Sequence, residues 1–407
     1  MDIKIINGGV CAAKGFKASG VHCGIRKNKQ KRDLSLIVSD KKAAAAAVYT
    51  TNLVKGAPLT VTKKNIADGF AQAVICNSGN ANTCNANGIE IAEQMCKLTE
   101  QYAGVGAEDV IVASTGVIGQ PLDITPIANG MESLVSKLSY DGSLTAAEGI
   151  MTTDTVVKEI AYEFECGGKK CRIGGIAKGS GMIHPNMATM LVFVTSDIAI
   201  DPKLLGEALS EDVKDSFNMV SVDGDTSTND MCCILANGMA ENKPIDNADG
   251  DDFKAFKKAL FAVTSYLCRM IAKDGEGASK LLEVKVDGAS DTSVAKTVAK
   301  SVACSSLLKA AMFGSDANWG RVLCAIGYSG ADVDVQKIDV SFRSKSGTVD
   351  VCKNGAGIEF SEEIAKQVLT EDEIEILISL GSGDKSATAW GCDLTYEYVK
   401  INGDYRT

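Results

Sequence analysis

A glycine-rich segment that leads directly into a buried apolar run constrains this chain more than any other feature. Residues 178–189 read Lys-Gly-Ser-Gly-Met-Ile-His-Pro-Asn-Met-Ala-Thr, and residues 190–194 (Met-Leu-Val-Phe-Val) follow without a polar interruption. An apolar run of this length fits a buried strand or a short buried helical segment. Thr189 lies at the junction, where threonine is usually an ordinary β-forming residue. If the Ala188–Thr189 peptide bond breaks, the hydroxyl lies beside a free α-amino group that can act as its general base.

The composition is that of a globular protein with a sizeable core. The chain has 407 residues, of which 45% are hydrophobic and 23% charged. This length allows two or three core-forming units, or one large layered domain with an additional lobe. The formal net charge of −10 argues against a nucleic-acid partner, because phosphate neutralisation requires clustered Lys and Arg.

The sequence also bounds the cellular location and the metal chemistry. No run approaches the roughly 18 apolar residues of a transmembrane helix, and the N-terminal segment carries Asp2 and lacks a signal-peptide core. We therefore expect a cytoplasmic protein with no membrane partner. The fourteen cysteines include no Cys-x-x-Cys pair, which favours reduced thiols over a disulfide framework. His22 and His184 are the only histidines, so most histidine-built zinc sites are excluded and no metal is expected.

Short β-rich runs alternate with helical stretches along the whole chain. The expected strands are residues 34–38, 71–76, 110–113, 159–164, 172–177, 191–195, 231–236, 282–286, 321–326, 339–342 and 375–379. The expected helices are residues 89–101, 126–138, 204–217, 252–274 and 294–312. This mixture predicts an α/β (α+β) layered sandwich, with sheets at the centre and helices outside.

Three polar, glycine-containing segments adjoin expected strands: residues 77–82 (Asn-Ser-Gly-Asn-Ala-Asn), 114–119 (Ser-Thr-Gly-Val-Ile-Gly) and 221–230 (Ser-Val-Asp-Gly-Asp-Thr-Ser-Thr-Asn-Asp). Loops at strand ends commonly carry functional residues, because a rigid sheet positions them. The alternative is that they are simple turns, in which Asn, Gly and Asp supply backbone conformations with positive φ.

Several catalytic classes have no support in the sequence. It contains no Gly-x-x-x-x-Gly-Lys-Ser/Thr phosphate loop, no Gly-x-Gly-x-x-Gly after a strand and no Gly-x-Ser-x-Gly nucleophile elbow. With only two histidines, a Ser-His-Asp triad or a Cys-His catalytic pair has few possible members. An N-terminal threonine needs no histidine, because its α-amino group titrates near pH 7.7–8.0 and can accept the hydroxyl proton.

The chain resembles the glutamate N-acetyltransferase/ornithine acetyltransferase family of arginine biosynthesis over essentially its whole length. The most specific match is the Lys178 to Leu191 block. The other matching blocks are residues 77–82, 114–119, 151–155 (Met-Thr-Thr-Asp-Thr), 221–230, 274–278 (Asp-Gly-Glu-Gly-Ala), 318–321 (Asn-Trp-Gly-Arg) and 391–407. So many blocks in the same order make a chance match implausible.

The resemblance implies a self-cleaving enzyme. Cleavage at Ala188–Thr189 would give an α chain, residues 1–188, and a β chain, residues 189–407, assembled as a dimer of αβ units. We expect an αββα-type, N-terminal-nucleophile-like fold with a smaller C-terminal lobe at about 285–375 and a C-terminal tail that returns to the active site. Thr189 would take the acetyl group from N-acetylornithine in a ping-pong reaction and pass it to glutamate. No cofactor is implied, and the resemblance leaves open whether acetyl-CoA also serves as a substrate.

The resemblance also implies roles for individual residues. Thr115 and Gly116 match the oxyanion-hole pair of the family. The positions that match substrate-binding residues are Thr152, Lys178, Thr189, Glu276, Asn402 and Thr407. Their chemistry is suitable, because the substrates carry carboxylates and, in N-acetylornithine, an ammonium group. A lysine can pair with a carboxylate, while a glutamate or the C-terminal carboxylate can accept an ammonium group. Taken singly, Lys178 and Glu276 could equally be surface ion pairs, and Asn402 could cap a turn.

Three departures from the family pattern concern substrate preference rather than reaction class. Ala317 stands where proline is usual before Asn318, and Trp390 stands where a small residue is common before Gly391. Residues 83–88 (Thr-Cys-Asn-Ala-Asn-Gly) are more polar than the usual continuation of the 77–82 block. Two other functional classes stay open at this point. Water could attack an acyl-Thr189 intermediate, which would make the chain an amidase or aminopeptidase. Alternatively, Thr189 could be a strand residue of a non-catalytic protein.

Overall fold

The computed structural model describes residues 3–184 and 190–404 and divides the chain into two compact units. The first unit comprises Met1–Gly179, Asn186–Phe217 and Thr226–Leu267, and the second comprises Ser180–Pro185, Asn218–Asp225 and Cys268–Thr407. The lobe that we expect at about 285–375 falls inside the second unit. Ala188, Thr189 and Thr407, to which the sequence assigns roles, lie outside the described residues.

The first unit contains a nine-stranded mixed sheet and six α-helices, of which the last continues into the second unit. Its strands are β1 (Lys4–Ile6), β2 (Phe16–Val21), β3 (Leu34–Tyr49), β4 (Phe70–Asn80), β5 (Val110–Val117), β6 (Lys158–Cys166), β7 (Lys169–Lys178), β8 (Leu191–Ser196) and β10 (Met231–Ala236). Its helices are α1 (Ala57–Asn65), α2 (Gly88–Ala103), α3 (Thr125–Ser136), α4 (Ser143–Ile150), α5 (Pro202–Asp215) and α6 (Asp251–Lys273), with short 3-10 turns at Gly9–Cys11 and Ala107–Asp109. A further 3-10 turn, Phe217–Met219, begins at the last residue of one segment of this unit and continues into the second unit.

The strand order is β1-β6-β7-β8-β10-β3-β4-β5, with β2 paired to β3 off this path. The 16-residue strand β3 joins two layers of this sheet. Its first half pairs with β2 and β4, and its second half pairs with β10, with a register shift to β4 between Val38 and Ala43. This irregularity lets one long strand belong to both layers.

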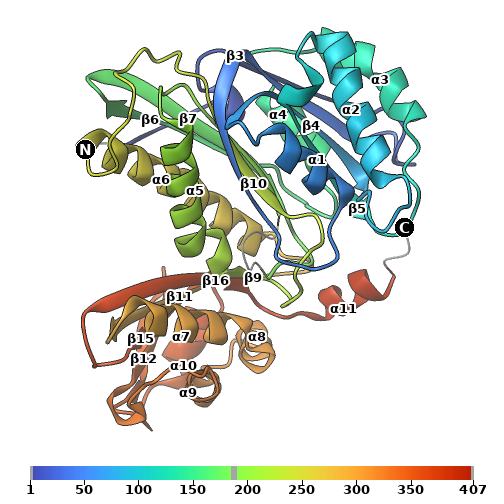
Figure 1. Cartoon of the computed structure of the whole chain (residues 1–407). Coiled ribbons are helices and arrows are strands. Elements are labelled where there is room, and N and C mark those ends of the chain that lie inside the picture. Colours follow the sequence, from blue (N-terminus) through green and yellow to red (C-terminus); the bar gives the residue numbers. More distant parts are fainter. Residues whose placement is uncertain (1–2, 185–189, 405–407) are drawn as a thin grey trace. The chain divides into compact units, whose positions relative to one another are not determined.

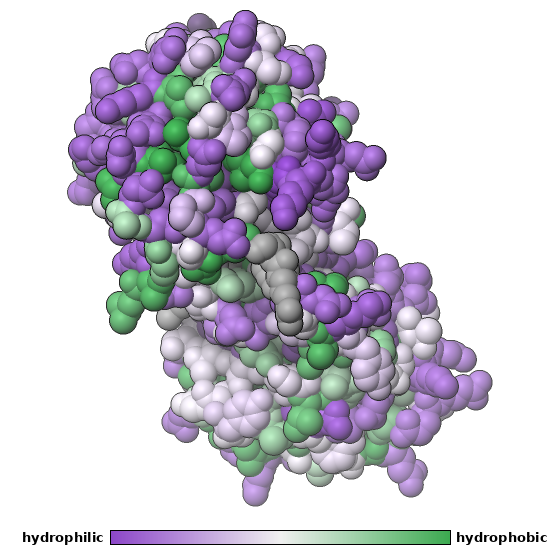
Figure 2. Space-filling view, turned by 90° about the vertical axis from the view of Figure 1, so that its right-hand side faces the viewer, coloured by the Kyte–Doolittle hydropathy of each residue, from purple (hydrophilic) through white to green (hydrophobic). Residues whose placement is uncertain are grey.

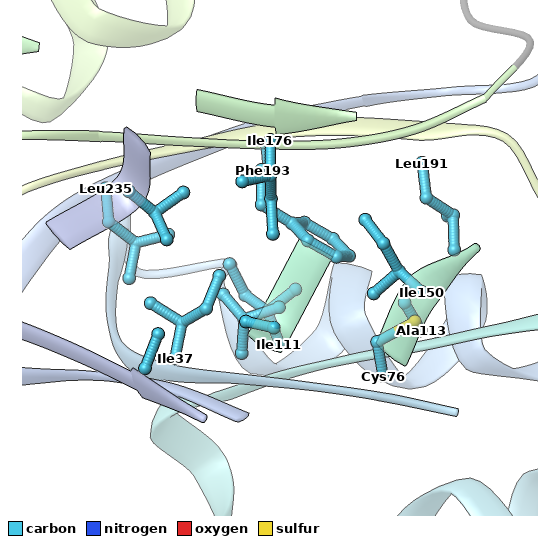
Figure 3. Close-up of a cluster of buried hydrophobic side chains, with 14 of the residues drawn as sticks. Ile37, Cys76, Ile111, Ala113, Ile150, Ile176, Leu191, Phe193 and Leu235 are labelled. Atoms are coloured by element: carbon cyan, nitrogen blue, oxygen red, sulfur yellow. The ribbon is translucent and has the colours of Figure 1, made fainter. Parts of the chain in front are cut away.

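The main core of the first unit lies between the two strand layers. Ile176 and Phe193, from β7 and β8, point toward Ile37 and Ile111, from β3 and β5 (Figure 3). Helix α4 contributes Ile150 to the same cluster. Because side chains alternate along a strand, the neighbouring residues of β3, β4 and β5 face outward instead.

Helices cover both outer faces of the layers (Figure 1). The outward residues of β3, β4 and β5 form a second cluster with apolar residues of α1, α2 and α3. On the opposite side α6 packs on β7 so closely that a Cβ on Gly175 would lie 3.1 Å from a methyl group of Val263, and α5 packs on β3. The predicted αββα arrangement is therefore confirmed.

The second unit contains a seven-stranded sheet of order β14-β13-β12-β15-β11-β16-β9. Its strands are β9 (Val220–Ser221), β11 (Leu281–Ala289), β12 (Asp339–Ser344), β13 (Gly347–Lys353), β14 (Ala356–Gly357), β15 (Glu373–Ser379) and β16 (Lys385–Cys392). Its helices are α7 (Thr292–Cys304), α8 (Ser306–Phe313), α9 (Trp319–Gly327), α10 (Glu362–Leu369) and α11 (Tyr396–Gly403), with a 3-10 turn at Val335–Lys337. Helix α7 packs on β11 and β16, and α10 packs on β12 and β13.

Two predicted elements of the second unit are wrong. Residues 321–326, predicted as a strand, lie in helix α9, because Val322, Ala325 and Ile326 have helical spacing and are buried together. The Asn318 side chain caps this helix by accepting a hydrogen bond from the Arg321 N–H at 3.3 Å. The single helix predicted at 294–312 is interrupted at Ser305, which caps α8 instead.

The view in Figure 2 shows hydrophilic residues interspersed with smaller hydrophobic groups over the drawn face. Within the described part of the chain, no helix combines the length and the apolar character that crossing a bilayer requires.

Asp212 on α5 provides a pH-dependent test of this fold. The residue is 9% exposed, and burial raises the pKa of its carboxyl group to about 7, although hydrogen bonds from Thr264 and Ser216 oppose the shift. A raised folded-state pKa means that the protonated carboxyl stabilises the fold fully below the unfolded value near 4, and that this contribution is lost as the pH rises through 7.

We expect Asp212→Asn to remove this pH dependence. Between pH 5 and pH 8, the unfolding free energy of the parent protein should fall relative to that of the variant by about 2.5 kcal/mol, because about two pKa units of the shift lie in this pH range at about 1.4 kcal/mol per unit. Urea denaturation at the two pH values measures the difference. A difference between the proteins that is the same at both pH values would contradict the assigned shift.

Candidate active site

The candidate oxyanion-hole residues lie at the end of strand β5. Thr115 is 9% exposed, and the parallel register places Gly116 opposite Gly79 of β4. Gly116 has φ +131°, and a Cβ there would lie 2.3 Å from the carbonyl carbon of Gly79 and 2.5 Å from the nitrogen of Asn80. Only glycine allows this approach of the two backbones. Residues 77–80 and 114–117, which the sequence places in loops, therefore belong to the strands themselves.

Hydrogen bonds from neighbouring strands and loops hold the backbone around Thr115. The Ser114 hydroxyl donates to Oδ1 of Asn77 at 2.6 Å, and the side-chain amide of Asn229 donates to the carbonyl oxygens of Ala81 and Ser114 at 2.5 and 3.0 Å. Backbone donors that are fixed before reaction are what an oxyanion hole requires, because no reorganisation is needed when charge develops.

A buried carboxylate joins the Thr152 segment to the start of the glycine-rich loop. Oδ1 of Asp154 accepts hydrogen bonds from Nζ of Lys158 at 2.8 Å and from the Gly179 N–H at 2.7 Å, and Oδ2 accepts from the Thr152 N–H at 2.9 Å. The Asp154 side chain thus holds the backbone at Thr152 and at Gly179, the residue after Lys178. The sequence alone assigned no role to Asp154. Asp154 and Lys158 are four residues apart, a spacing that brings two side chains together on a helix. Here Lys158 begins strand β6 instead, so the sequence spacing did not indicate that the two side chains form an ion pair.

The electrostatics of this cluster favour an ionised carboxylate. Burial alone would raise the pKa of Asp154, but the positive charges of Lys158 and Lys178, together with the hydrogen bonds, hold it well below its usual range. Asp230 beside β10 is the opposite case. Burial raises the pKa of Asp230 well above its usual range, against hydrogen bonds from Ser227 and the charge of Lys178. The charge of Lys178 therefore acts to lower the pKa of both carboxyl groups, although burial dominates at Asp230.

We expect Asp154→Asn to destabilise the fold strongly. The Asp154 and Lys158 side chains are both 0% exposed, so the variant would bury the ammonium group without its carboxylate, at a cost of about 3–5 kcal/mol. Urea denaturation measures the loss. The exposed pair Lys203 and Glu207 has the same sequence spacing, and Glu207→Gln should cost less than about 1 kcal/mol. Equal effects of the two substitutions would contradict the assigned burial of charge.

Strand pairing places Lys178 beside Leu191, which follows the expected nucleophile by two positions in the sequence. Lys178 is the last residue of β7 and is 9% exposed. The antiparallel register pairs it with Leu191 at the start of β8, and Thr189 precedes Leu191 by two positions.

The second unit contains the other predicted substrate-binding residues. The Asn402 side chain on α11 donates a hydrogen bond to Oε2 of Glu276 at 2.8 Å, so these two residues are in contact. A Cβ on Gly181 would lie 2.3 Å from the carboxyl carbon of Glu276. The Glu276 N–H donates to the Ser180 carbonyl oxygen at 2.9 Å, and the Ser180 hydroxyl donates to the Asp274 carbonyl oxygen at 2.6 Å. The glycine-rich loop after Gly179 therefore rests on the Glu276 segment, and the glycine at 181 leaves room for the carboxylate.

Asp223 anchors the next part of this loop, and the sequence reasoning did not single it out. Its two carboxylate oxygens accept the N–H groups of Met182 and Ile183 at 2.6 and 2.8 Å. Burial, with the negative charges of Asp223 and Glu276, raises the pKa of the nearby Tyr398 phenol. The roles of all these residues in substrate binding stay predictions.

Comparison with known proteins places these features in one family. The family model described as the ArgJ family matches residues 17–407. The chain is 49% identical over 406 residues to the arginine biosynthesis bifunctional protein ArgJ of Caldanaerobacter subterraneus subsp. tengcongensis, with 100% of each chain covered. A crystal structure of ArgJ from Bacillus halodurans is 45% identical, with a TM-score of 0.49, and covers 52% of this chain and 98% of its own. A structure of ornithine acetyltransferase with ornithine from Mycobacterium tuberculosis is 33% identical, with a TM-score of 0.43, and covers 46% of this chain and 100% of its own.

Proposed function

The chain belongs to the ArgJ family, and from this premise we propose that it transfers the acetyl group of N2-acetyl-L-ornithine to L-glutamate in arginine biosynthesis. The observation that carries this proposal is the 49% identity over the whole length of both chains to a curated ArgJ protein. It favours an acetyltransferase over the hydrolase and over a non-catalytic protein, because the compared relative is named for a biosynthetic activity.

In this proposal the reaction has two half-reactions. The Thr189 hydroxyl attacks the acetyl carbonyl of N-acetylornithine while the free α-amino group of Thr189 accepts its proton. The tetrahedral oxyanion is stabilised at Thr115 and Gly116, and collapse expels the ornithine amine, which takes up the proton. The amino group of glutamate then attacks the acetyl-threonine ester, and the reverse proton transfer regenerates Thr189.

Charge complementarity assigns the remaining residues. Lys178 suits a substrate carboxylate, because it is a cation at the start of the glycine-rich loop. Glu276, held by Asn402, suits the side-chain ammonium group of ornithine, and the C-terminal carboxylate at Thr407 would be a second acceptor. Thr152 would contribute a hydroxyl or backbone contact. These assignments follow the family resemblance residue by residue.

We also propose that acetyl-CoA is a second acetyl donor. The support is the word "bifunctional" in the name of the compared ArgJ protein. Both donors would acylate the same Thr189, so the second half-reaction would be shared. No resident cofactor and no metal enter this scheme.

The same proposal covers processing, assembly and location. The precursor would cleave itself at Ala188–Thr189, and the chains 1–188 and 189–407 would associate as a dimer of αβ units. The cytoplasm is the proposed location, because the substrates are free amino acids.

Acetate release with and without glutamate tests the reaction class. An acetyltransferase should form N-acetylglutamate from N-acetylornithine and glutamate, and it should release acetate slowly when glutamate is omitted. Mass spectrometry of the products and an acetate assay measure both rates. Fast acetate release that is indifferent to glutamate would overturn the transferase in favour of the hydrolase.

A further inference from the structure

The second unit carries a pocket that the proposed mechanism does not use. Its volume is about 430 Å³, within the range of cavities that hold small ligands. The residues that line it are His184, Met219, Lys296, Thr297, Lys300, Ser301, Cys304 and Ser329. Lys296, Lys300 and Cys304 are spaced four residues apart on α7, so they share one helix face. The pocket therefore has a cationic wall built on a single rigid element.

The lining of this pocket favours an anion. Two lysines and a histidine line it together with three hydroxyl groups, and the lining includes no Asp or Glu. Burial lowers the pKa of Lys300, and the negative charge that a Cys304 thiolate would carry opposes this. A bound anion would likewise raise the pKa of Lys300 against the effect of burial, because a nearby negative charge favours the ammonium form.

The His184 ring lies close to Cys304 of this helix and to Ser221. Nδ1 of His184 lies 3.5 Å from Sγ of Cys304 and 3.1 Å from Oγ of Ser221. Burial and then the charge of Lys300 lower the pKa of His184, while the carboxylates of Asp223 and Asp225 act in the opposite direction. The lowered pKa disfavours the charged form of His184, and its neutral ring can donate or accept a hydrogen bond according to its tautomer.

We propose that this pocket binds the phosphate groups of coenzyme A, the carrier portion of acetyl-CoA. Lysine ammonium groups and Ser or Thr hydroxyls are suitable phosphate partners. N-acetylornithine fits this wall poorly, because its side chain carries an ammonium group that Lys296 and Lys300 would repel. This inference rests on the proposed use of acetyl-CoA as a second donor, whereas the acetylornithine reaction does not depend on it.

Direct titration is the first arm of the test. Coenzyme A is titrated calorimetrically into the full-length protein, its Lys296→Met/Lys300→Met variant and the control Lys366→Met, whose lysine is exposed on α10 of the same unit. We expect the double variant to bind at least about tenfold more weakly, about 1.4 kcal/mol, and the control to bind like the parent. Inorganic pyrophosphate should compete with coenzyme A. Absence of binding to the parent protein at millimolar concentration, or equal affinity in all three proteins, would overturn the proposal.

Cysteine labelling locates the bound ligand. Cys304 lines the pocket, whereas Cys324 on α9 is exposed elsewhere. Coenzyme A should slow iodoacetamide labelling of Cys304 and leave that of Cys324 unchanged, as peptide mass spectrometry can measure. Protection of neither cysteine would place the binding site outside this pocket and would overturn the assignment.

Kinetics separate this inference from the proposed function. In the double variant the KM for acetyl-CoA should rise at least about tenfold, while acetyl transfer from N-acetylornithine keeps its kcat and KM. An equal loss with both donors would show a structural role for the lysines and overturn the inference. If the parent protein did not transfer acetyl groups from N-acetylornithine at all, the proposed function would be wrong. The titration and labelling would still show whether coenzyme A binds in this pocket.

Discussion

Thr189→Ala is expected to yield a single uncleaved chain of 42.6 kDa with no acetyl transfer. Alanine removes the hydroxyl that would attack the Ala188 carbonyl, and without cleavage no α-amino group is released to act as the base. The parent protein should instead give fragments of ~20 and ~23 kDa, in proportion to the residues on each side of the bond. Denaturing electrophoresis and a transfer assay measure the two losses.

Thr189→Ser is the matched control, because serine keeps the hydroxyl and loses only a methyl group. It should retain cleavage and transfer at reduced rates. The nucleophile would be wrongly assigned if Thr189→Ala kept full transferase activity. A parent protein that stayed a single band after prolonged incubation would refute autoprocessing altogether.

Gly116→Ala is expected to lower kcat for acetyl transfer at least about 10²-fold, the loss that follows removal of one oxyanion donor. The new Cβ would lie 2.3 Å from the Gly79 carbonyl carbon, so β4 and β5 must separate where Thr115 and Gly116 are held. Steady-state kinetics at saturating substrates measure the effect, and circular dichroism reports whether the fold survives.

Gly119→Ala is the control for backbone strain. Gly119 also has a positive φ, +79°, but nothing lies within 4 Å of a Cβ built there. Gly119→Ala should therefore have the cost of a positive φ at a non-glycine residue, but no steric clash of the new Cβ with a neighbouring strand. We expect kcat to change only a few fold. Thr115→Ala provides a second approach if Gly116→Ala does not fold, because it should slow transfer and leave the strand pairing intact. Equal activity of Gly116→Ala and Gly119→Ala would contradict the oxyanion assignment.

Strand and helix types were largely predictable wherever the apolar periodicity was long. The strands around Ile111 and Phe193 and the helix around Phe256 were expected from their sequence patterns and are present in the structure. One of the two errors, at 321–326, arose because the apolar run of five residues at 322–326 fits either a strand or a helix. Asn318, the N-cap residue of α9, indicates the start of a helix, but hydrophobicity alone does not reveal it.

The candidate site was only partly predictable. Contiguous blocks identified Thr115, Lys178 and Glu276, since each block has a recognisable local pattern. Asp154 lay within a matching block, but its role depends on Lys158 and on the Gly179 N–H. Such a role cannot be read from local sequence, because it depends on which strands become neighbours.

Local chemistry and periodicity are properties of neighbouring residues, so the amino-acid order alone already defined the alternating elements, the layered fold class and the candidate nucleophile at Thr189. Strand partners are set by packing between residues far apart in the chain, and only the tertiary structure could decide them. It decided that β3 belongs to both layers, that Gly116 meets Gly79, and that Asp154 joins two segments through one buried carboxylate. The physical reason is that hydrophobic burial is non-directional and leaves many pairings open, whereas hydrogen-bond register and close backbone contact select one.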